Sequence, residues 1–244
     1  MDQLLEIIGL KKSFGKKTVV SDVNFSVNSG NIVGLLGPNG AGKSTTFYMI
    51  VGVYKPDKGK IMLNNEDITY NQMYIMLLRA RKGITYLPQE PSIFRKLSVE
   101  DNIKVVFETM EYNPDLIEEK TEEIMKNMNI LHIRRSKGYS LSGGERRRVE
   151  ISRALATAPI FMLLDEPFAG IDPIAVNELR GIIFSLKEKG IGIIISDHNV
   201  RDTLNACDMA YIINNGRIIE QGDPKQIANS ENAKRIYLGE DFKL

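Results

Sequence analysis

The chain has 244 residues, of which 32 are Lys or Arg and 31 are Asp or Glu, so its formal net charge is +1. Charged residues make up 26% of the chain and hydrophobic residues 43%, which are proportions of a globular protein and exclude a disordered one. The charge balance lacks the basic excess typical of nucleic-acid-binding proteins. We therefore expect no nucleic-acid partner.

The single cysteine, Cys207, cannot form an internal disulfide, which favours a reducing compartment such as the cytoplasm. The N-terminus has no basic stretch followed by an apolar run, so we expect no signal peptide. The longest apolar runs have about five residues, whereas a membrane-spanning helix needs about 20. The chain is therefore expected to meet a membrane only through a partner.

The first third of the chain is predicted to contain short strands. Apolar residues at 23, 25 and 27 alternate with polar ones, as in a half-buried strand. Residues 32–36 are apolar throughout, which is typical of a central strand covered on both faces. A glycine-rich loop follows, then a predicted helix from about Lys43 to Val51 and a further short strand at 61–63.

From about Pro91 to Ala158 the pattern predicts helices. Ser98 and Ser142 each precede an acidic residue by three positions, which is the capping-box pattern of a helix start. Asp172 followed by Pro173 predicts another helix start further along the chain.

Strands return after this helical stretch, at 160–164, 191–196 and 209–213, and the sequence Asn214-Asn215-Gly216 predicts a hairpin turn. We therefore expect one domain, 1–244, with an α/β core formed by residues 1–90 and 159–244. A helical subdomain, residues 91–158, is predicted to interrupt that core.

The strongest motif begins at Gly37 and matches G-x-x-x-x-G-K-[ST] between a predicted strand and a predicted helix. Its glycines let backbone N–H groups face a phosphate, and the helix N-terminus adds its positive dipole end. Lys43 is expected to reach the β- and γ-phosphates, and the Ser44 hydroxyl a Mg²⁺ ion. The predicted nucleotide-binding residues here are Gly37, Pro38, Asn39, Gly40, Ala41, Gly42, Lys43, Ser44 and Thr45.

A second motif is an apolar run that ends in Asp165 and Glu166. Ligands of open α/β sheets bind at the carboxyl ends of strands. Asp165 is predicted to hold Mg²⁺ through water, and Glu166 to polarise the attacking water at the γ-phosphate. Adjacent strand residues point in opposite directions, so the two carboxylates should take different roles. The alternative is an acidic strand end at a surface turn.

The third motif is Leu141-Ser142-Gly143-Gly144-Glu145. It is either an ordinary capped helix start or a second anion site. In the second interpretation the Ser142 hydroxyl and the two glycine amides would donate to a phosphate.

In this order, the phosphate loop, residues 141–145 and Leu164-Asp165-Glu166-Pro167 resemble the nucleotide-binding subunits of ATP-binding-cassette (ABC) proteins. The resemblance covers about residues 4–220. It implies an α/β P-loop ABC ATPase core, with a mixed sheet whose N-terminal strands are antiparallel, and an inserted helical subdomain. It also implies ATP hydrolysis, with ATP and Mg²⁺ bound.

The resemblance also implies roles for single residues. Gln89 would reach Mg²⁺, His198 would contact the γ-phosphate and Phe14 would stack on adenine. Asp172 would lie in the loop that crosses a homodimer interface, and Ser142, Gly143, Gly144 and Glu145 would contact the ATP of the second copy. The implied catalytic residues are Glu166, His198 and Lys43, and the implied metal ligands are Ser44, Gln89 and Asp165. The simpler alternatives are a plain loop glutamine, a solvated histidine and a phenylalanine packed under a hairpin.

Within the family, residues 86–99, 165–174, 197–201 and 235–244 resemble ATPase subunits of bacterial lipopolysaccharide exporters. This implies a cytoplasmic homodimer beneath two transmembrane permease subunits, peripheral on the cytoplasmic face of the inner membrane. ATP hydrolysis would drive lipopolysaccharide extraction toward the outer membrane.

The same resemblance suggests a permease docking groove with Phe94, Arg95 and Leu97, although Phe94 is alternatively a core residue. The Arg146-Arg147-Arg148 run is predicted to be a solvated helix face. Two other functions stay open at this point: the ATPase of a branched-chain amino-acid importer, and a non-transport ABC ATPase of the iron–sulfur assembly type.

Overall fold

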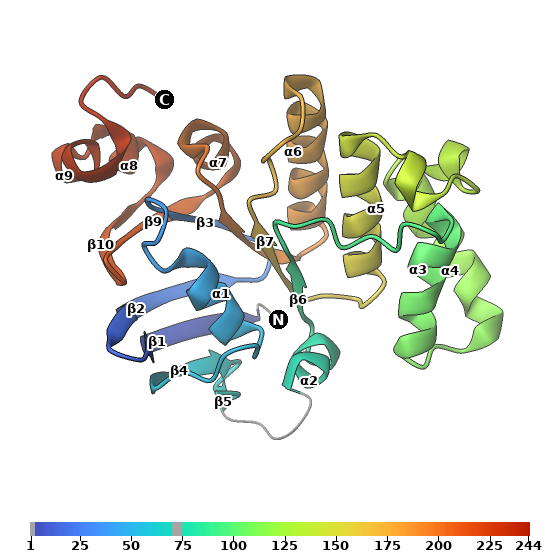
Figure 1. The fold of residues 1–244 in the computed structure, drawn as a ribbon, viewed down its shortest axis with the longest axis horizontal. Coiled ribbons are helices and arrows are strands. Elements are labelled where there is room, and N and C mark those ends of the chain that lie inside the picture. Colours follow the sequence, from blue (N-terminus) through green and yellow to red (C-terminus); the bar gives the residue numbers. More distant parts are fainter. Residues whose placement is uncertain (1–2, 70–74) are drawn as a thin grey trace.

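The computed structural model describes residues 3–69 and 75–244, and their strands form one twisted sheet (Figure 1). The order across the sheet is β5-β4-β1-β2-β10-β9-β3-β8-β7-β6. The strands are β1 (Leu4–Phe14), β2 (Lys17–Asn28), β3 (Ile32–Leu36), β4 (Lys58–Leu63), β5 (Glu66–Asp67), β6 (Ile84–Leu87), β7 (Phe161–Asp165), β8 (Gly192–Ser196), β9 (Met209–Asn214) and β10 (Arg217–Gly222).

The sheet has a parallel half and an antiparallel half. Strands β3, β6, β7 and β8 run parallel, whereas β1 pairs antiparallel with both β2 and β4. The prediction of a mixed α/β fold with antiparallel N-terminal strands is therefore confirmed. In the parallel half, Ser196 pairs with Leu35 on one side and with Asp165 on the other. The carboxyl ends of three strands consequently meet at one edge, where a ligand of such a sheet binds.

Alternation of side chains along the strands divides the core into two layers. All five residues of β3 are buried; Ile32 and Leu36 join one layer, and Val33 and Leu35 join the other. Because successive strand residues point to opposite faces, this central strand must be apolar throughout. The buried positions 23, 25 and 27 of β2 likewise confirm the alternation predicted there.

Helices cover both faces of the sheet. They are α1 (Lys43–Ile50), α2 (Ile75–Arg81), α3 (Val99–Thr109), α4 (Pro114–Asn127), α5 (Gly143–Leu155), α6 (Pro173–Glu188), α7 (Val200–Ala206), α8 (Pro224–Asn229) and α9 (Glu231–Ala233), with short 3₁₀ turns at Leu131–Ile133 and Gly138–Ser140 and a π-helical turn at Lys234–Leu238. Within residues 3–69 and 75–244, no helix is both long and apolar enough to cross a membrane.

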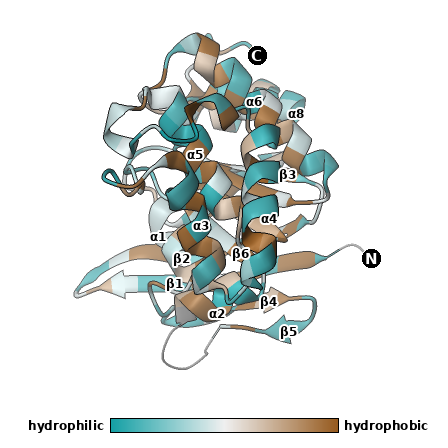
Figure 2. Cartoon of the chain, turned by 90° about the vertical axis from the view of Figure 1, so that its right-hand side faces the viewer, coloured by the Kyte–Doolittle hydropathy of each residue, from teal (hydrophilic) through white to brown (hydrophobic). Residues whose placement is uncertain are grey.

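The chain between β6 and β7 carries α3, α4 and α5, which lie beyond α6 in Figure 1. Hydrophilic and hydrophobic residues alternate along α3 and α4 in Figure 2, and their buried residues include Ile103, Phe107 and Met125. Both predicted capping boxes are present, since Ser98 bonds with Asp101 and Ser142 with Glu145. Local hydrogen bonds at the N-terminus therefore define where α3 and α5 begin.

Candidate functional site

The glycine-rich loop leads from β3 into α1, as its sequence predicts. A Cβ atom at Gly37 would lie 2.1 Å from the carbonyl oxygen of Ile213, and Gly37 has a φ of +153°. Only glycine fits this close approach of the loop to the end of β9. The loop is therefore held against the sheet at its first residue.

Lys43, the first residue of α1, points back into this loop. Its Nζ atom donates to the carbonyl oxygens of Gly37 at 2.6 Å and Pro38 at 3.1 Å. Burial lowers the pKa of Lys43, although the negative charges of Glu166, Asp165 and Asp197 oppose this effect. The ammonium thus stays within the loop, bound to two carbonyl groups that an anionic ligand could replace.

A pocket of about 130 Å³ opens at the loop. Glu166 reaches it from the end of β7, and Gly37, Pro38 and Ala41 complete the loop beside it. The residues that line it are Val19, Asn39, Gly40, Gly42, Lys43, Ser44, Thr45 and Glu166.

Asp165 is the last residue of β7, and its side chain is almost completely buried, at 3% exposure. One carboxylate oxygen accepts a hydrogen bond from the Tyr86 hydroxyl at 3.1 Å. The other, Oδ1, has no hydrogen-bond partner among the described residues. Burial raises the pKa of Asp165, and the nearby Ser196 and Ser44 hydroxyls offset this only in part. A buried carboxylate oxygen without a donor is a group that a cation would satisfy.

This donor set fits Mg²⁺. The ion prefers hard oxygen ligands, and it uses one or two carboxylates together with water and phosphate rather than an all-protein cage. No cluster of three or more His, Cys, Asp or Glu side chains that could hold a metal occurs in the part of the chain that is described.

Glu166 follows β7 directly and has a left-handed backbone, with φ of +46°. The expectation of simple strand alternation is therefore wrong for this residue, because β7 ends at Asp165 and the chain turns there. The two carboxylates nevertheless have different partners. Oε2 of Glu166 accepts a hydrogen bond from Gln89 Nε2 at 2.7 Å and lies 3.2 Å from His198 Nδ1.

This contact brings together three predicted residues from different parts of the sheet. Gln89 follows β6, Glu166 follows β7 and His198 follows β8. These three strands are neighbours and run parallel, so their carboxyl ends deliver all three side chains to one place. The arrangement can bind and orient a water molecule beside the phosphate-loop pocket.

Ser142 caps α5. Its hydroxyl accepts from the Glu145 amide. The Ser142 hydroxyl and the Ser142 amide both donate to the Glu145 carboxylate, and these two bonds lower the pKa of Glu145. Ser142 and Gly143 remain exposed. The capping interpretation is thus correct, and the same exposed helix start is also available to an anion.

Asp172 caps α6, accepting hydrogen bonds from the amides of Ile174 and Ala175 at 3.0 Å each. Ile174 beside it is 73% exposed. Phe14, at the end of β1, is 43% exposed and meets the Tyr54 ring edge-on at 5.2 Å. Phe14 is thus not packed under the hairpin, and it is also not among the residues that line the phosphate-loop pocket.

Phe94 lies in the segment between β6 and α3 and is 47% exposed, so the alternative that it is a core residue is wrong. The Arg153 guanidinium lies 4.5 Å from the centre of its ring. A groove of about 320 Å³ beside it contains Arg95, whereas Leu97 is half-buried and does not line the groove. The groove is lined by Pro91, Ile93, Arg95, Gly138, Tyr139 and Arg146.

The prediction of a solvated arginine run is wrong for Arg147, which is only 7% exposed. Its guanidinium donates to the carbonyl oxygens of Pro88 and Asp165 and pairs with Glu150 at 3.2 Å. Arg147 therefore joins α5 to the segments that carry Gln89 and Glu166. Helical spacing could have indicated this, because Arg147 lies on the same face as Ile151 and Ala154, which are also buried.

Comparison with known proteins gives consistent results. A family model described as ABC transporter matches residues 20–169. The chain is 54% identical over 242 residues to the "Lipopolysaccharide export system ATP-binding protein LptB" of Haemophilus influenzae, covering 99% of each chain. It is 52% identical to the protein of that name from Escherichia coli K12, covering 96% of this chain and 97% of the relative.

Among solved structures, a nucleotide-free ATP-binding cassette from an ABC transporter is similar, with a TM-score of 0.87 and 30% sequence identity. The similarity covers 98% of this chain and all of that one, 100%. The strand order and the helices between β6 and β7 therefore match a known architecture along their whole length.

Proposed function

The chain belongs to the ABC transporter family, and from this premise we propose that it is the ATP-hydrolysing subunit of a lipopolysaccharide exporter. The chain is 54% identical, over nearly its full length, to a lipopolysaccharide export ATP-binding protein. This identity supports lipopolysaccharide as the transported substrate. The observation that carries the chemistry is the Glu166 carboxylate, which Gln89 and His198 hold beside the phosphate-loop pocket.

ATP binding begins with an exchange of partners at Lys43. The ammonium leaves the carbonyl oxygens of Gly37 and Pro38 and bonds to the β- and γ-phosphates instead. The backbone N–H groups of the loop and the N-terminus of α1 face the same phosphates. This exchange keeps the Lys43 ammonium paired while it stabilises the bound phosphates.

Ser44, Gln89 and Asp165 are the residues that would hold Mg²⁺. When bound, the ion neutralises charge on the β- and γ-phosphates. Glu166 acts as the general base, accepting a proton from the attacking water through its carboxylate. Gln89 and His198 orient that carboxylate, and His198 also contacts the γ-phosphate.

The functional unit is a head-to-tail homodimer. In Figure 1, α5 and α1 lie on opposite sides of α6, and Gly143 at the start of α5 lines a second pocket, which shares Glu166 with the phosphate-loop pocket. No residue of α5 lines the phosphate-loop pocket in the described chain. Two-fold pairing would bring the exposed Ser142–Glu145 segment of one copy to the ATP of the other. Phe14, which is exposed at the end of β1, would stack on adenine, and Asp172 would cross the interface.

Transport requires two transmembrane permease subunits, which the groove beside Phe94 and Arg95 would receive; Leu97 lies half-buried in the same loop. The dimer then works at the cytoplasmic face of the inner membrane and is attached there through these partners. ATP stabilises the closed dimer, because it contacts both copies only in that state.

The substitution Glu166→Gln tests the proposed base. The variant should bind ATP with normal affinity but hydrolyse it at least about 100-fold more slowly, because general-base catalysis contributes factors of this size. It should also accumulate an ATP-bound dimer, measurable by size-exclusion chromatography. The exposed Glu178, on the surface of α6, provides a matched control as Glu178→Gln. Hydrolysis near the wild-type rate by Glu166→Gln would refute the assignment.

A further inference from the structure

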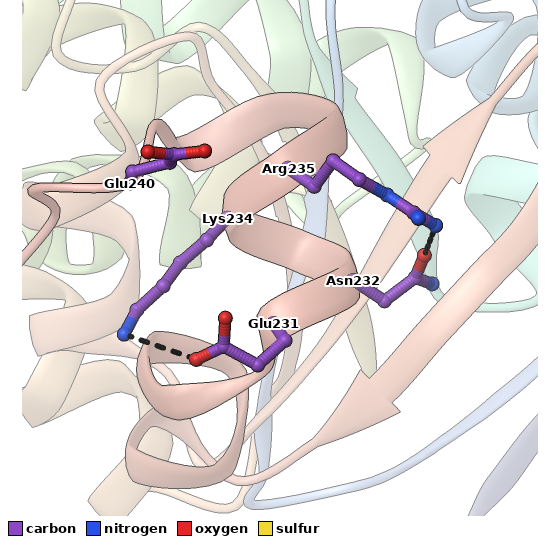
Figure 3. Close-up of a pocket in the computed structure, with 5 residues that line it drawn as sticks. All are labelled: Glu231, Asn232, Lys234, Arg235 and Glu240. Carbon is purple, nitrogen blue, oxygen red and sulfur yellow. Dashed lines mark hydrogen bonds and ion pairs between the residues drawn. The ribbon is translucent and has the colours of Figure 1, made fainter.

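A hollow of about 700 Å³ lies beside α9 and the π-helical turn that follows it, and Figure 3 shows the side chains that line it. Lys234 Nζ lies 3.8 Å from a carboxylate oxygen of Glu231, and Arg235 donates a hydrogen bond to Asn232 at 3.2 Å. Because these groups pair with one another, the hollow gives no indication of a ligand.

A different polar group lies next to the proposed catalytic residues. Asp197, the residue between β8 and His198, is a completely buried carboxylate, with an exposed fraction of 0%. Its Oδ1 atom accepts a hydrogen bond from the Asn199 amide at 2.8 Å, and its Oδ2 atom accepts one from the Phe168 amide at 3.1 Å. Burial raises the pKa of Asp197, and these two amides oppose the rise. Each oxygen therefore has its own backbone partner.

The two partners belong to different loops, which follow β7 and β8. Phe168 lies two residues after Glu166, and its side chain is buried in the main core. The Glu166 amide donates to the Ser196 carbonyl oxygen at 2.6 Å, so the two loops are already joined at the strand ends. The Asp197 carboxylate joins them a second time, two residues further along. The segment that begins at Glu166 is thus bonded at two points to the loop that carries His198.

The side chain of His198 extends from this doubly joined loop. It is 59% exposed, so packing alone does not hold it. Its Nδ1 atom lies 3.2 Å from Glu166 Oε2 and 3.5 Å from Asp197 Oδ1. The amide that Asp197 binds belongs to the peptide group between His198 and Asn199. Asp197 therefore fixes the backbone from which the exposed imidazole reaches Glu166.

We infer that Asp197 is a positioning residue that keeps His198 against the Glu166 carboxylate during ATP hydrolysis. The inference rests on the proposed hydrolysis at Glu166 and adds a residue that acts only through another. With the bond to Phe168 in place, the loop after β8 cannot move away from the loop after β7. Without it, only the bond at the strand ends remains, and His198 loses its fixed position. Asp197 thus affects kcat more than KM for ATP.

The substitution Asp197→Asn keeps the size of the side chain and removes one bond. Its single carboxamide oxygen can accept from the Asn199 amide, but its NH₂ group then faces the Phe168 N–H, which it cannot accept. The value of kcat should fall at least about tenfold, the effect of losing a hydrogen bond to a charged group. KM for ATP should stay within about twofold. Asp197→Ser is a second variant, because its one oxygen can also serve only one of the two amides.

A double-mutant cycle with His198→Ala separates positioning from a general loss of structure. The single variant His198→Ala should itself lower kcat. In its background, Asp197→Asn should change kcat by less than about twofold, because the residue that Asp197 positions is gone. If Asp197→Asn does not fold, the cycle is made with Asp197→Ser. An equal loss of kcat in both backgrounds would show a merely structural role, and the inference would be wrong.

The experiment uses the full chain, with steady-state ATPase kinetics in the presence of Mg²⁺ and thermal unfolding to verify that each variant is folded at the assay temperature. Asp223→Asn is the matched control, because Asp223 also accepts a backbone amide, that of Gln226 at 2.9 Å, but lies at the start of α8; it should change neither kcat nor KM. Wild-type kcat in Asp197→Asn or in His198→Ala would overturn the inference alone. A wild-type chain that hydrolyses no ATP would overturn the proposed function, and this inference with it.

Discussion

Asp165 is the residue at which the requirements of folding and of catalysis conflict most directly. Its carboxylate is buried, burial raises its pKa, and one oxygen finds no hydrogen-bond donor among the residues that the structure describes. Such a group destabilises the nucleotide-free protein and becomes favourable once a cation is bound. Strain of this kind is common at functional sites, which are less stable than they could be.

The substitution Asp165→Asn should therefore stabilise the nucleotide-free protein while abolishing ATP hydrolysis. The folded protein binds the Asp165 proton more tightly than the unfolded chain, so ionisation lowers the free energy of unfolding as the pH rises above the ordinary pKa of 3.8. At pH 8 the thermal midpoint of the variant should exceed that of the wild type, by about 2–4 °C for each kcal/mol gained in the free energy of unfolding. This advantage should shrink as the pH falls toward 4.

Thermal unfolding followed by circular dichroism over that pH range would measure the effect. A second variant, Asp208→Asn, provides the control, because Asp208 is a partly exposed aspartate that pairs with Lys187. If the thermal midpoint of Asp165→Asn at pH 8 were lower than that of the wild type, the ionised carboxylate would not be destabilising the folded protein.

At the scale of elements, Phe94 lies in the segment between β6 and α3, where its backbone is hydrogen-bonded to α3 and its side chain is exposed. Asn102 of α3 accepts from the Phe94 amide at 2.8 Å and donates to the Phe94 carbonyl at 3.1 Å. The Phe94 ring nevertheless remains 47% exposed, with Arg153 against it. An aromatic side chain presented in this way is typical of a binding surface.

Phe94→Ala should accordingly weaken assembly with the permeases and leave the cassette intact. Co-purification of the membrane subunits should fall at least about tenfold, the cost of truncating an interface anchor. Thermal stability should change by no more than about 0.5 kcal/mol, since the side chain is exposed, and ATP binding should not change. Leu116→Ala on α4, where Leu116 is 42% exposed, provides a control. Unchanged complex yield from Phe94→Ala would contradict a docking role.

At the scale of the whole molecule, one chain contains one phosphate loop and one α5 start, and the two face different pockets. In the proposed dimer, an active site that uses both elements combines two copies. In the proposed dimer the interface is isologous, since the phosphate loop of each copy meets the α5 start of the other, and the two-fold axis closes the dimer after two chains.

Mixing two inactive variants tests this arrangement. Lys43→Ala removes the phosphate-loop cation, and Ser142→Arg blocks the start of α5; each should be inactive alone. An equal mixture contains dimers with one intact composite site, so about a quarter of the wild-type ATPase activity should return if sites act independently. Each variant alone, at the same total protein concentration, is the control. Full activity of Ser142→Arg alone would exclude a composite site.

The sequence by itself determined the parts of this protein that depend on short-range geometry. The phosphate loop, the helix starts at Ser98 and Ser142 and the central apolar strand each follow from a few neighbouring residues. Backbone conformation, capping bonds and side-chain alternation are local properties, so they can be recognised without knowing the fold. The mixed sheet with antiparallel N-terminal strands was predictable only through the family resemblance, because strand pairing is not a local property.

Only the tertiary structure decided which distant groups share partners. It joined Gln89 and His198 on one oxygen of Glu166 and buried Arg147 against Pro88 and Asp165. Gln89, Glu166 and His198 are brought together by the order of strands in the sheet. No local pattern encodes such contacts, because their free energies depend on burial and on partners that the completed core alone provides.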